Sequence, residues 1–170
     1  MLFRSVVAWE VALARKDGPT CLVFSRQNLP FQKRAPDTAG AVRRGGYVLV
    51  EPAREPRAVI IATGSEVSLA VEAQKLLMQE GISVRVVSMP STTVFDRQDL
   101  HYRERVLPPL LPTVAVEAGA PDLWRKYVGR TGTVVGIDRF GESAPAGELF
   151  QLFGLTPERV AKSVSALLID

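Results

Sequence analysis

The feature that most constrains the fold is an uninterrupted apolar run, Ala58–Ala62, followed at once by a polar turn. A short run of this kind is typical of a strand buried on both faces of a sheet. Apolar residues then recur at helical spacing from Val67 to Leu77, and Gly81 stands where a helix ends. A second strand-like run, Ser83–Ser88, follows. The sequence therefore predicts strand, helix and strand, joined by a right-handed crossover.

The rest of the chain repeats this alternation of short apolar runs and amphipathic stretches. The further predicted strands are Tyr47–Val50, Thr113–Glu117 and Thr133–Ile137, and the further predicted helices are Asp99–Val106, Pro121–Tyr127, Pro145–Phe153 and Pro157–Leu168. We expect an α/β fold: a three-layer domain whose mainly parallel sheet of about five strands has helices on both faces.

The first 45 residues follow a different pattern. Residues 2–16 have apolar side chains at helical spacing, and Thr20–Phe24 predicts a buried strand. From Leu29 to Gly46, prolines, glycines and cations recur without a period, which predicts a linker. One helix and one strand cannot enclose a core, so we expect residues 2–25 to be the remnant of another α/β domain. Their apolar side would then pack on a second molecule or be disordered.

Composition excludes several classes of protein. A length of 170 residues fits one domain, or one domain with an appendage. The lone cysteine, Cys21, excludes an internal disulfide and a CxxC metal site, and the lone histidine, His101, excludes a His-pair metal site. The net charge is only +3 and the arginines are scattered, which favours a mixed solvated surface over nucleic-acid binding. No apolar run is long enough to span a membrane, and no signal peptide is evident, so we expect a cytoplasmic protein.

Several polar segments follow the predicted strands, where α/β sheets usually bind ligands. Thr63 and Glu66 have the spacing of a helix capping box, which we favour over anion binding at the same turn. For Glu117 a surface or interface role is favoured over a general base. In the loop from Asp138 to Ser143 an internal ion pair and helix capping are favoured. Glu117, Asp138 and Glu142 could share a pocket, although their spacing does not show it.

Other conspicuous side chains have ordinary interpretations. Cys21 lies in the predicted apolar strand and is expected to be an inert small hydrophobe. His101, in a charged stretch, is expected to be solvated. Trp124 and Tyr127 share a helix face, as core or interface residues do.

Arg26 is the exception among the charged residues. It directly follows the predicted strand Thr20–Phe24 and is flanked by Ser25, Gln27 and Asn28. A guanidinium at the carboxyl end of a strand suits a phosphate or carboxylate ligand. From its position alone, ligand binding and a structural ion pair both remain open.

Six segments, in order along the chain, resemble transketolase. They are Gly18–Leu29 with its Ser25-Arg26-Gln27-Asn28 core, Arg44–Leu49, Ile61–Val67, Val84–Ser91, Val116–Gly119 and Phe140–Pro145. The resemblance covers nearly the whole chain from about Val6, and Met1–Ser5 does not share it.

The resemblance implies a function and a domain organisation. Transketolases use thiamine diphosphate and Mg²⁺ to transfer a two-carbon ketol unit between phosphorylated sugars in the pentose phosphate pathway, and they are homodimers. By this resemblance, residues 1–30 are the remnant of the pyrimidine-binding domain, residues 31–46 are a linker and residues 47–170 are the C-terminal domain. The family's substrate-phosphate arginine corresponds to Arg26.

The resemblance also implies what the chain lacks. The family's Gly-Asp-Gly segment, its catalytic glutamate and its substrate-binding histidines would all lie upstream of this sequence. We therefore expect the chain alone to be inactive, to bind neither cofactor nor metal, and to need the remainder of transketolase as its partner. Two alternatives stay open: a stand-alone, non-catalytic binding or regulatory module, and the same domain of a related thiamine-dependent enzyme. Whether the chain is truncated, split or naturally short also stays open.

Overall fold

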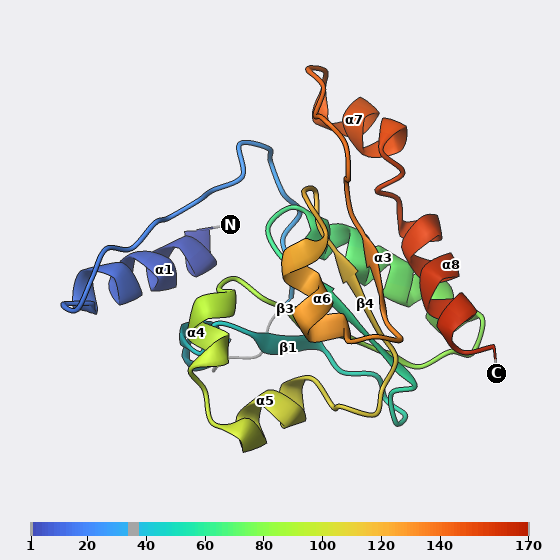
Figure 1. The fold of residues 1–170 in the computed structure, drawn as a ribbon, viewed down its shortest axis with the longest axis horizontal. Coiled ribbons are helices and arrows are strands. Elements are labelled where there is room, and N and C mark those ends of the chain that lie inside the picture. Colours follow the sequence, from blue (N-terminus) through green and yellow to red (C-terminus); the bar gives the residue numbers. More distant parts are fainter. Residues whose placement is uncertain (1, 34–37, 170) are drawn as a thin grey trace.

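The computed structural model describes residues 2–33 and 38–169, and the side chains from Arg4 onward in those ranges (Figure 1). The strands are β1 (Tyr47–Val50), β2 (Ala58–Ala62), β3 (Val84–Ser88), β4 (Thr113–Val116) and β5 (Thr133–Val135). The helices are α1 (Leu2–Ala14), α2 (Thr38–Arg43), α3 (Glu66–Gln79), α4 (Thr92–Asp96), α5 (Leu100–Val106), α6 (Asp122–Val128), α7 (Ala146–Leu152) and α8 (Pro157–Leu167).

The strands form one five-stranded sheet in the order β1-β3-β2-β4-β5. β2 is central and pairs in parallel with β3 on one side and β4 on the other, and β5 extends the parallel set. Only the edge strand β1 is antiparallel, with Tyr47 opposite Ser88. The predicted α/β fold with a mainly parallel sheet is confirmed.

Helices cover both faces of the sheet and enclose two apolar cores. α3 and α8 pack on one face of the sheet. There the side chain of Ile60 lies in a core with those of Leu77 and Val164. α4, α5 and α6 pack on the other, where Ile61 meets Phe95 and other large side chains. Every residue of β2 is buried, as the uninterrupted apolar run predicts.

Capping side chains begin two of the helices but not a third. The side chains of Asp99 and Thr156 accept hydrogen bonds from the backbone at the starts of α5 and α8. The predicted capping box at α3 is wrong. Ser65, not Thr63, is its N-cap, and no side chain caps this helix. Glu66 is instead turned inward and is 4% exposed.

The turn before β1 depends on Gly45. Its φ is +84°, and a β-carbon there would lie 2.5 Å from both the Phe95 nitrogen and the Ser91 oxygen. A glycine is therefore required by conformation and by space together. This gives a physical reason for the Arg44-Gly45-Gly46 segment.

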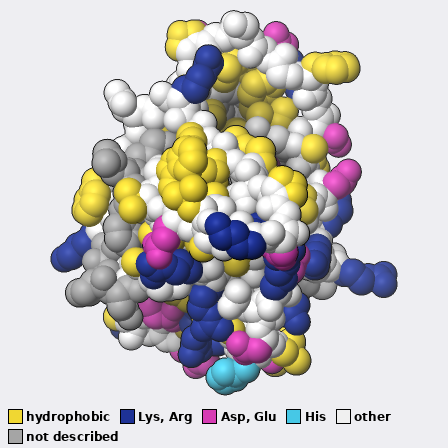
Figure 2. All heavy atoms as spheres, turned by 90° about the vertical axis from the view of Figure 1, so that its left-hand side faces the viewer, with side chains coloured by type: hydrophobic (Ala, Val, Ile, Leu, Met, Phe, Trp, Pro, Cys, Tyr) yellow, Lys and Arg dark blue, Asp and Glu magenta, His cyan; other side chains and the backbone are white. Residues whose placement is uncertain are grey.

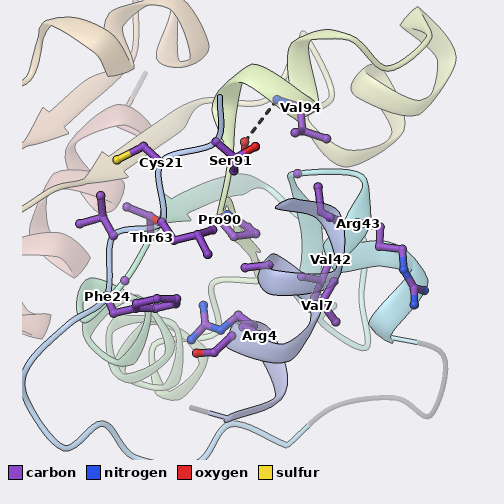
Figure 3. A pocket seen from close by; sticks show the side chains of 18 of the residues that line it. Arg4, Val7, Cys21, Phe24, Val42, Arg43, Thr63, Pro90, Ser91 and Val94 are labelled. Carbon is purple, nitrogen blue, oxygen red and sulfur yellow. Dashed lines mark hydrogen bonds between the residues drawn. The ribbon is translucent and has the colours of Figure 1, made fainter. Parts of the chain in front are cut away.

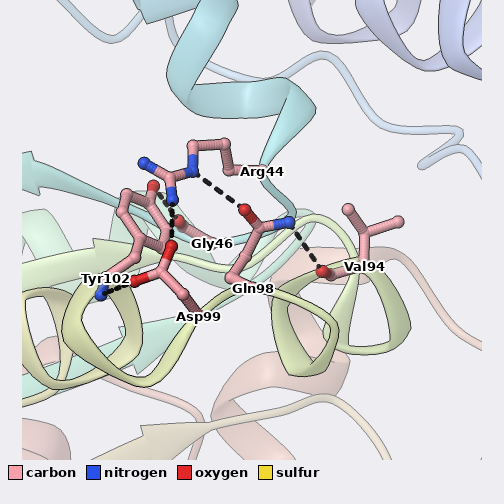
Figure 4. A network of polar contacts seen from close by, with 6 residues as sticks. All are labelled: Arg44, Gly46, Val94, Gln98, Asp99 and Tyr102. Carbon is pink, nitrogen blue, oxygen red and sulfur yellow. Dashed lines mark hydrogen bonds and ion pairs between the residues drawn. The ribbon is translucent and has the colours of Figure 1, made fainter.

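Arg44 joins the same turn to α4 and α5 (Figure 4). Its Nε donates to Gln98 Oε1 at 2.9 Å and its Nη2 to Asp99 Oδ2 at 3.1 Å. The guanidinium lies 3.2 Å from the centroid of the Tyr102 ring, whose hydroxyl donates to the Gly46 oxygen. These contacts fix the entry of the chain into the domain.

The N-terminal segment departs from the sequence-based picture in three ways. The predicted strand Thr20–Phe24 is wrong, because these residues are extended without strand pairing and Val23 is 87% exposed. The predicted linker contains α2. The expected disorder of the first helix is wrong, because α1 is formed and Val7 is buried against Val42 and Tyr47. α4 was not predicted as a separate helix.

Candidate functional site

The carboxyl ends of the two central strands form the edge at which the candidate site lies. β2 and β4 are neighbours, but the helices that follow them, α3 and α6, cover opposite faces of the sheet. Open α/β sheets bind ligands in the crevice where chain connections change direction in this way. The Thr63–Glu66 turn and the segment Glu117–Gly119 are therefore placed at this edge.

Glu66 is a buried carboxyl at this edge. Its Oε1 accepts a hydrogen bond from the Ser65 hydroxyl at 3.0 Å. Burial raises the pKa of Glu66, and the nearby charge of Glu117 raises it as well, while hydrogen bonds from its own backbone N–H, Ser65 and the Ala118 N–H act in the opposite direction. Glu66 thus keeps its proton to a higher pH than an exposed glutamate.

Glu117 is anchored within the domain. Its Oε2 accepts a hydrogen bond from the indole Nε1 of Trp124 at 2.7 Å. Trp124 is 1% exposed and belongs to the core under α6, so the core role predicted for it is confirmed. Glu117 is half-buried and held in place rather than free on the surface.

A cavity of about 240 Å³ opens beside this edge, between α1 and the extended N-terminal segment (Figure 3). Its walls are mostly apolar, with Phe24 and Arg4 pointing toward one another from opposite sides. Arg4 Nη1 donates to the hydroxyl of Ser88, at the carboxyl end of β3, at 3.1 Å. α1 is therefore connected to the edge of the sheet at which the candidate site lies.

Arg26 lies in the Ser25–Asn28 segment, which runs past the same edge. It is exposed and makes no hydrogen bond or ion pair with any residue in the described ranges. Its neighbour Ser25 is half-buried and lines the cavity together with Thr63 and Gly64. The structural ion pair left open by the sequence is thus not formed, and the guanidinium is available to an anion.

Comparisons with known proteins assign the family. Residues 45–156 match the model of the transketolase-like TK C-terminal domain. Transketolase 1 of Vibrio cholerae is 54% identical over 165 residues, which are 96% of this chain and 25% of that protein. The chain belongs to the transketolase family. It spans about a quarter of the length of the curated transketolases it matches.

Solved transketolase structures show the same fold. The transketolase from Leishmania mexicana matches with a TM-score of 0.89 and 42% identity over 98% of this chain and 24% of its own. An inactive β4 tetramer of a split-gene transketolase matches with a TM-score of 0.59 and 30% identity, over 84% of this chain and 48% of its own.

The other candidate residues are dispersed over this transketolase chain. In the loop after β5, Arg139 and Glu142 form the predicted ion pair at 3.2 Å, but the predicted capping is absent, because no side chain caps α7. Cys21 is exposed and points away from the cavity centre, so its predicted place in an apolar strand is wrong (Figure 3). His101 is exposed, as predicted.

Sequence reasoning missed the pair formed by Glu66 and Glu117. It grouped Glu117 with Asp138 and Glu142, both of which are exposed. The available signal was that Glu66 and Glu117 each follow a strand closely. Recognising them as neighbours requires the strand order, because β2 and β4 are separated along the chain by β3.

The surface shows mixed charge, and the described residues form no cluster of metal-ligating side chains. On the face in Figure 2, lysines and arginines are interleaved with acidic side chains, and apolar side chains gather above them. Within residues 2–33 and 38–169, no three histidine, cysteine or acidic side chains are grouped so that they could hold a metal ion. Nor is any helix in those ranges long and apolar enough to cross a membrane.

Proposed function

We propose that this chain is the C-terminal part of a transketolase that transfers a two-carbon ketol unit between phosphorylated sugars in the pentose phosphate pathway, in the cytoplasm. The observation that carries the proposal is the 54% identity to Transketolase 1 of Vibrio cholerae across 96% of the chain. The matching Pichia stipitis transketolase, at 38% identity, is a complex with sedoheptulose 7-phosphate. A phosphorylated ketose is therefore the substrate class we propose.

In this proposal Arg26 binds the substrate phosphate. Its guanidinium carries a permanent charge and a planar set of N–H donors, which match the oxygens of a phosphate. It is exposed and has no competing partner among the described residues. Its neighbours in the sequence, Ser25, Gln27 and Asn28, have polar side chains that can form hydrogen bonds.

We propose that the thiamine diphosphate and Mg²⁺ of the complete enzyme are held outside this chain. The described part contains no cluster of acidic, histidine or cysteine side chains suited to a metal ion. We assign both groups to the remainder of the enzyme, and no step of the reaction to this chain except phosphate binding.

We propose that the remainder of transketolase and a second subunit are the partners of this chain. Large apolar side chains on α1 and after it are exposed, among them Val6, Trp9 and Phe31. Such surface is typical of an interface. Because the chain corresponds to about a quarter of its relatives, most of the enzyme that would cover this surface lies outside it. The inactive split-gene tetramer supports the proposal that the isolated chain has no activity.

The test uses a hybrid enzyme, in which this chain replaces the aligned quarter of Vibrio cholerae transketolase 1. We expect the hybrid to form sedoheptulose 7-phosphate from pentose phosphates when supplied with thiamine diphosphate and Mg²⁺, and the purified chain alone to form none. Turnover by the purified chain would disprove its inactivity. A folded hybrid without activity would favour the stand-alone module.

A further inference from the structure

The Ser25–Asn28 segment contains no regular element of its own and takes its position from what it touches. Ser25, the residue before Arg26, contacts the Thr63–Glu66 turn. A β-carbon at Gly64 would lie 3.7 Å from Ser25 Oγ, so the bare backbone of this glycine lies beside the serine hydroxyl. The segment that carries Arg26 therefore rests on the turn after β2.

The side chain of Glu66 supports the Thr63–Glu66 turn. The same β-carbon at Gly64 would lie 3.3 Å from Glu66 Oε2, so the buried carboxyl lies directly against the turn. Gly64 has a φ of +52°, and the Glu66 N–H donates to the Thr63 oxygen at 3.1 Å, which closes the turn tightly. Ser25 Oγ and Glu66 Oε2 thus both lie beside the backbone of Gly64.

The N-terminal segment and the domain together match the fold of a solved transketolase. The Leishmania mexicana structure matches 98% of this chain with a TM-score of 0.89, and that coverage includes both the N-terminal segment and the domain. Both the Ser25–Asn28 segment and the Thr63–Glu66 turn therefore belong to a chain whose fold as a whole matches that of a complete transketolase.

We propose that the Thr63–Glu66 turn, supported by the buried side chain of Glu66, positions the Ser25–Asn28 segment and thereby Arg26 for the substrate phosphate. Glu66 is then a positioning residue that acts through Gly64 and Ser25. The inference rests on the proposed phosphate role of Arg26. It gives the C-terminal domain a part in substrate recognition.

The test compares a phosphorylated and an unphosphorylated substrate in the hybrid enzyme. We expect Glu66→Ala to raise the KM for fructose 6-phosphate about fivefold, because small displacements of a binding group weaken its contact strongly. The kcat/KM for fructose, which has no phosphate, should change less than about twofold. Glu66→Gln should restore the KM, because its amide fills the same space and can still bond to Ser65.

Gln74→Ala is the matched control. Gln74 is also a buried polar residue of α3, 6% exposed, but it lies two turns away from the Thr63–Glu66 turn. It should leave both substrates unaffected. The proposal is overturned if Glu66→Ala leaves the KM for fructose 6-phosphate unchanged, if it lowers kcat/KM for both substrates equally, or if Gln74→Ala has the same effect.

A second pair of variants serves if Glu66→Ala does not fold. Gly64→Asn and Gly81→Asn both place a side chain at a positive φ, which asparagine tolerates better than most residues. A β-carbon at Gly81 has no neighbour within 4 Å, whereas at Gly64 it faces Ser25 and Glu66. Only Gly64→Asn should raise the KM for fructose 6-phosphate, and equal KM values in the two variants would overturn the proposal.

Arg26→Ala separates this inference from the function on which it rests. It should raise the KM for fructose 6-phosphate about tenfold or more, since it removes charge-assisted hydrogen bonds. If it has no effect, the phosphate role of Arg26 and the positioning inference both fail. If Arg26→Ala raises the KM but the Glu66 and Gly64 variants do not, only the positioning inference fails.

Discussion

Two short apolar runs of this chain, Ala58–Ala62 and Thr20–Phe24, differ completely in burial. In Ala58–Ala62, no residue is more than 1% exposed, whereas Val23 in Thr20–Phe24 is 87% exposed. β2 is hydrogen-bonded to strands on both sides and is covered by helices on both faces. Within the described ranges, no strand pairs with Thr20–Phe24. An apolar run therefore specifies a buried strand only where the rest of a sheet surrounds it.

The largest expected effect is on the free energy of unfolding, and it differs between the two apolar runs. Ile60→Ala should lower the free energy of unfolding of the isolated chain by about 4 kcal/mol, because it leaves a cavity in a core that cannot collapse. Val23→Ala should change it by no more than about 0.5 kcal/mol, as expected of an exposed side chain. Urea denaturation followed by circular dichroism measures both. A comparable loss in the two variants would contradict the distinction between the regions.

The next effect concerns the turn that joins the regions. Gly45→Ala should destabilise the chain by about 3 kcal/mol, because the new methyl group meets backbone atoms of Phe95 and Ser91 at an unfavourable φ. Gly40→Ala, within α2, meets nothing within 4 Å and should stabilise by about 0.5 kcal/mol. Thermal unfolding of the two variants tests this, and equal melting temperatures would disprove it.

A smaller effect is a dependence of stability on pH that arises at the edge of the domain. Because the pKa of Glu66 is raised in the folded state, its protonated form is favoured there. The associated stability is fully present below the pKa of the unfolded state and is lost as the pH rises through the folded pKa. Glu66→Gln should therefore become more stable relative to the parent chain as the pH rises from 4 to 8. Urea titrations at several pH values check this, and a difference independent of pH would refute it.

The smallest expected effect concerns the docking of α1. Glu10 and Arg43 join α1 to α2 by a paired contact at 2.7 Å, but both side chains are about half exposed. Glu10→Ala should thus cost about 0.5 kcal/mol or less and should matter less at high salt. Hydrogen exchange of the α1 amides should become faster at low salt, while β2 stays protected. Asp17→Ala, which removes an exposed pair within the N-terminal segment, is the control and should leave α1 unchanged.

The sequence predicted the fold well where burial repeats along the chain. β2, α3 and β3 follow from the periodicity of the apolar residues. α4 is one short turn of helix before Arg97, and its five residues carry too little periodicity to stand out. Thr20–Phe24 was predicted wrongly because its pattern indicates a strand but does not supply the neighbouring strands.

The candidate site was predicted only in part. Position and resemblance together identified Arg26, whose role remains a prediction. Glu66 was assigned to a capping box because it lies three residues after Thr63. The same spacing occurs when the glutamate is buried and supports the turn. In the structure Glu66 is instead buried, beside the positive-φ backbone of Gly64. Local spacing does not contain that information.

The antiparallel direction of β1 has a consequence for how the domain is attached. Because Tyr47 lies opposite Ser88, β1 begins at the carboxyl edge of the parallel strands. The incoming chain is thus joined to the domain at the edge where Ser25 meets Gly64. A parallel β1 would start at the far edge, about 13 Å away for four residues. The chain between Ser25 and Tyr47 therefore begins and ends at the same edge of the sheet. This keeps the local concentration of the Ser25–Asn28 segment near the Thr63–Glu66 turn high even when the contact between Ser25 and Gly64 opens.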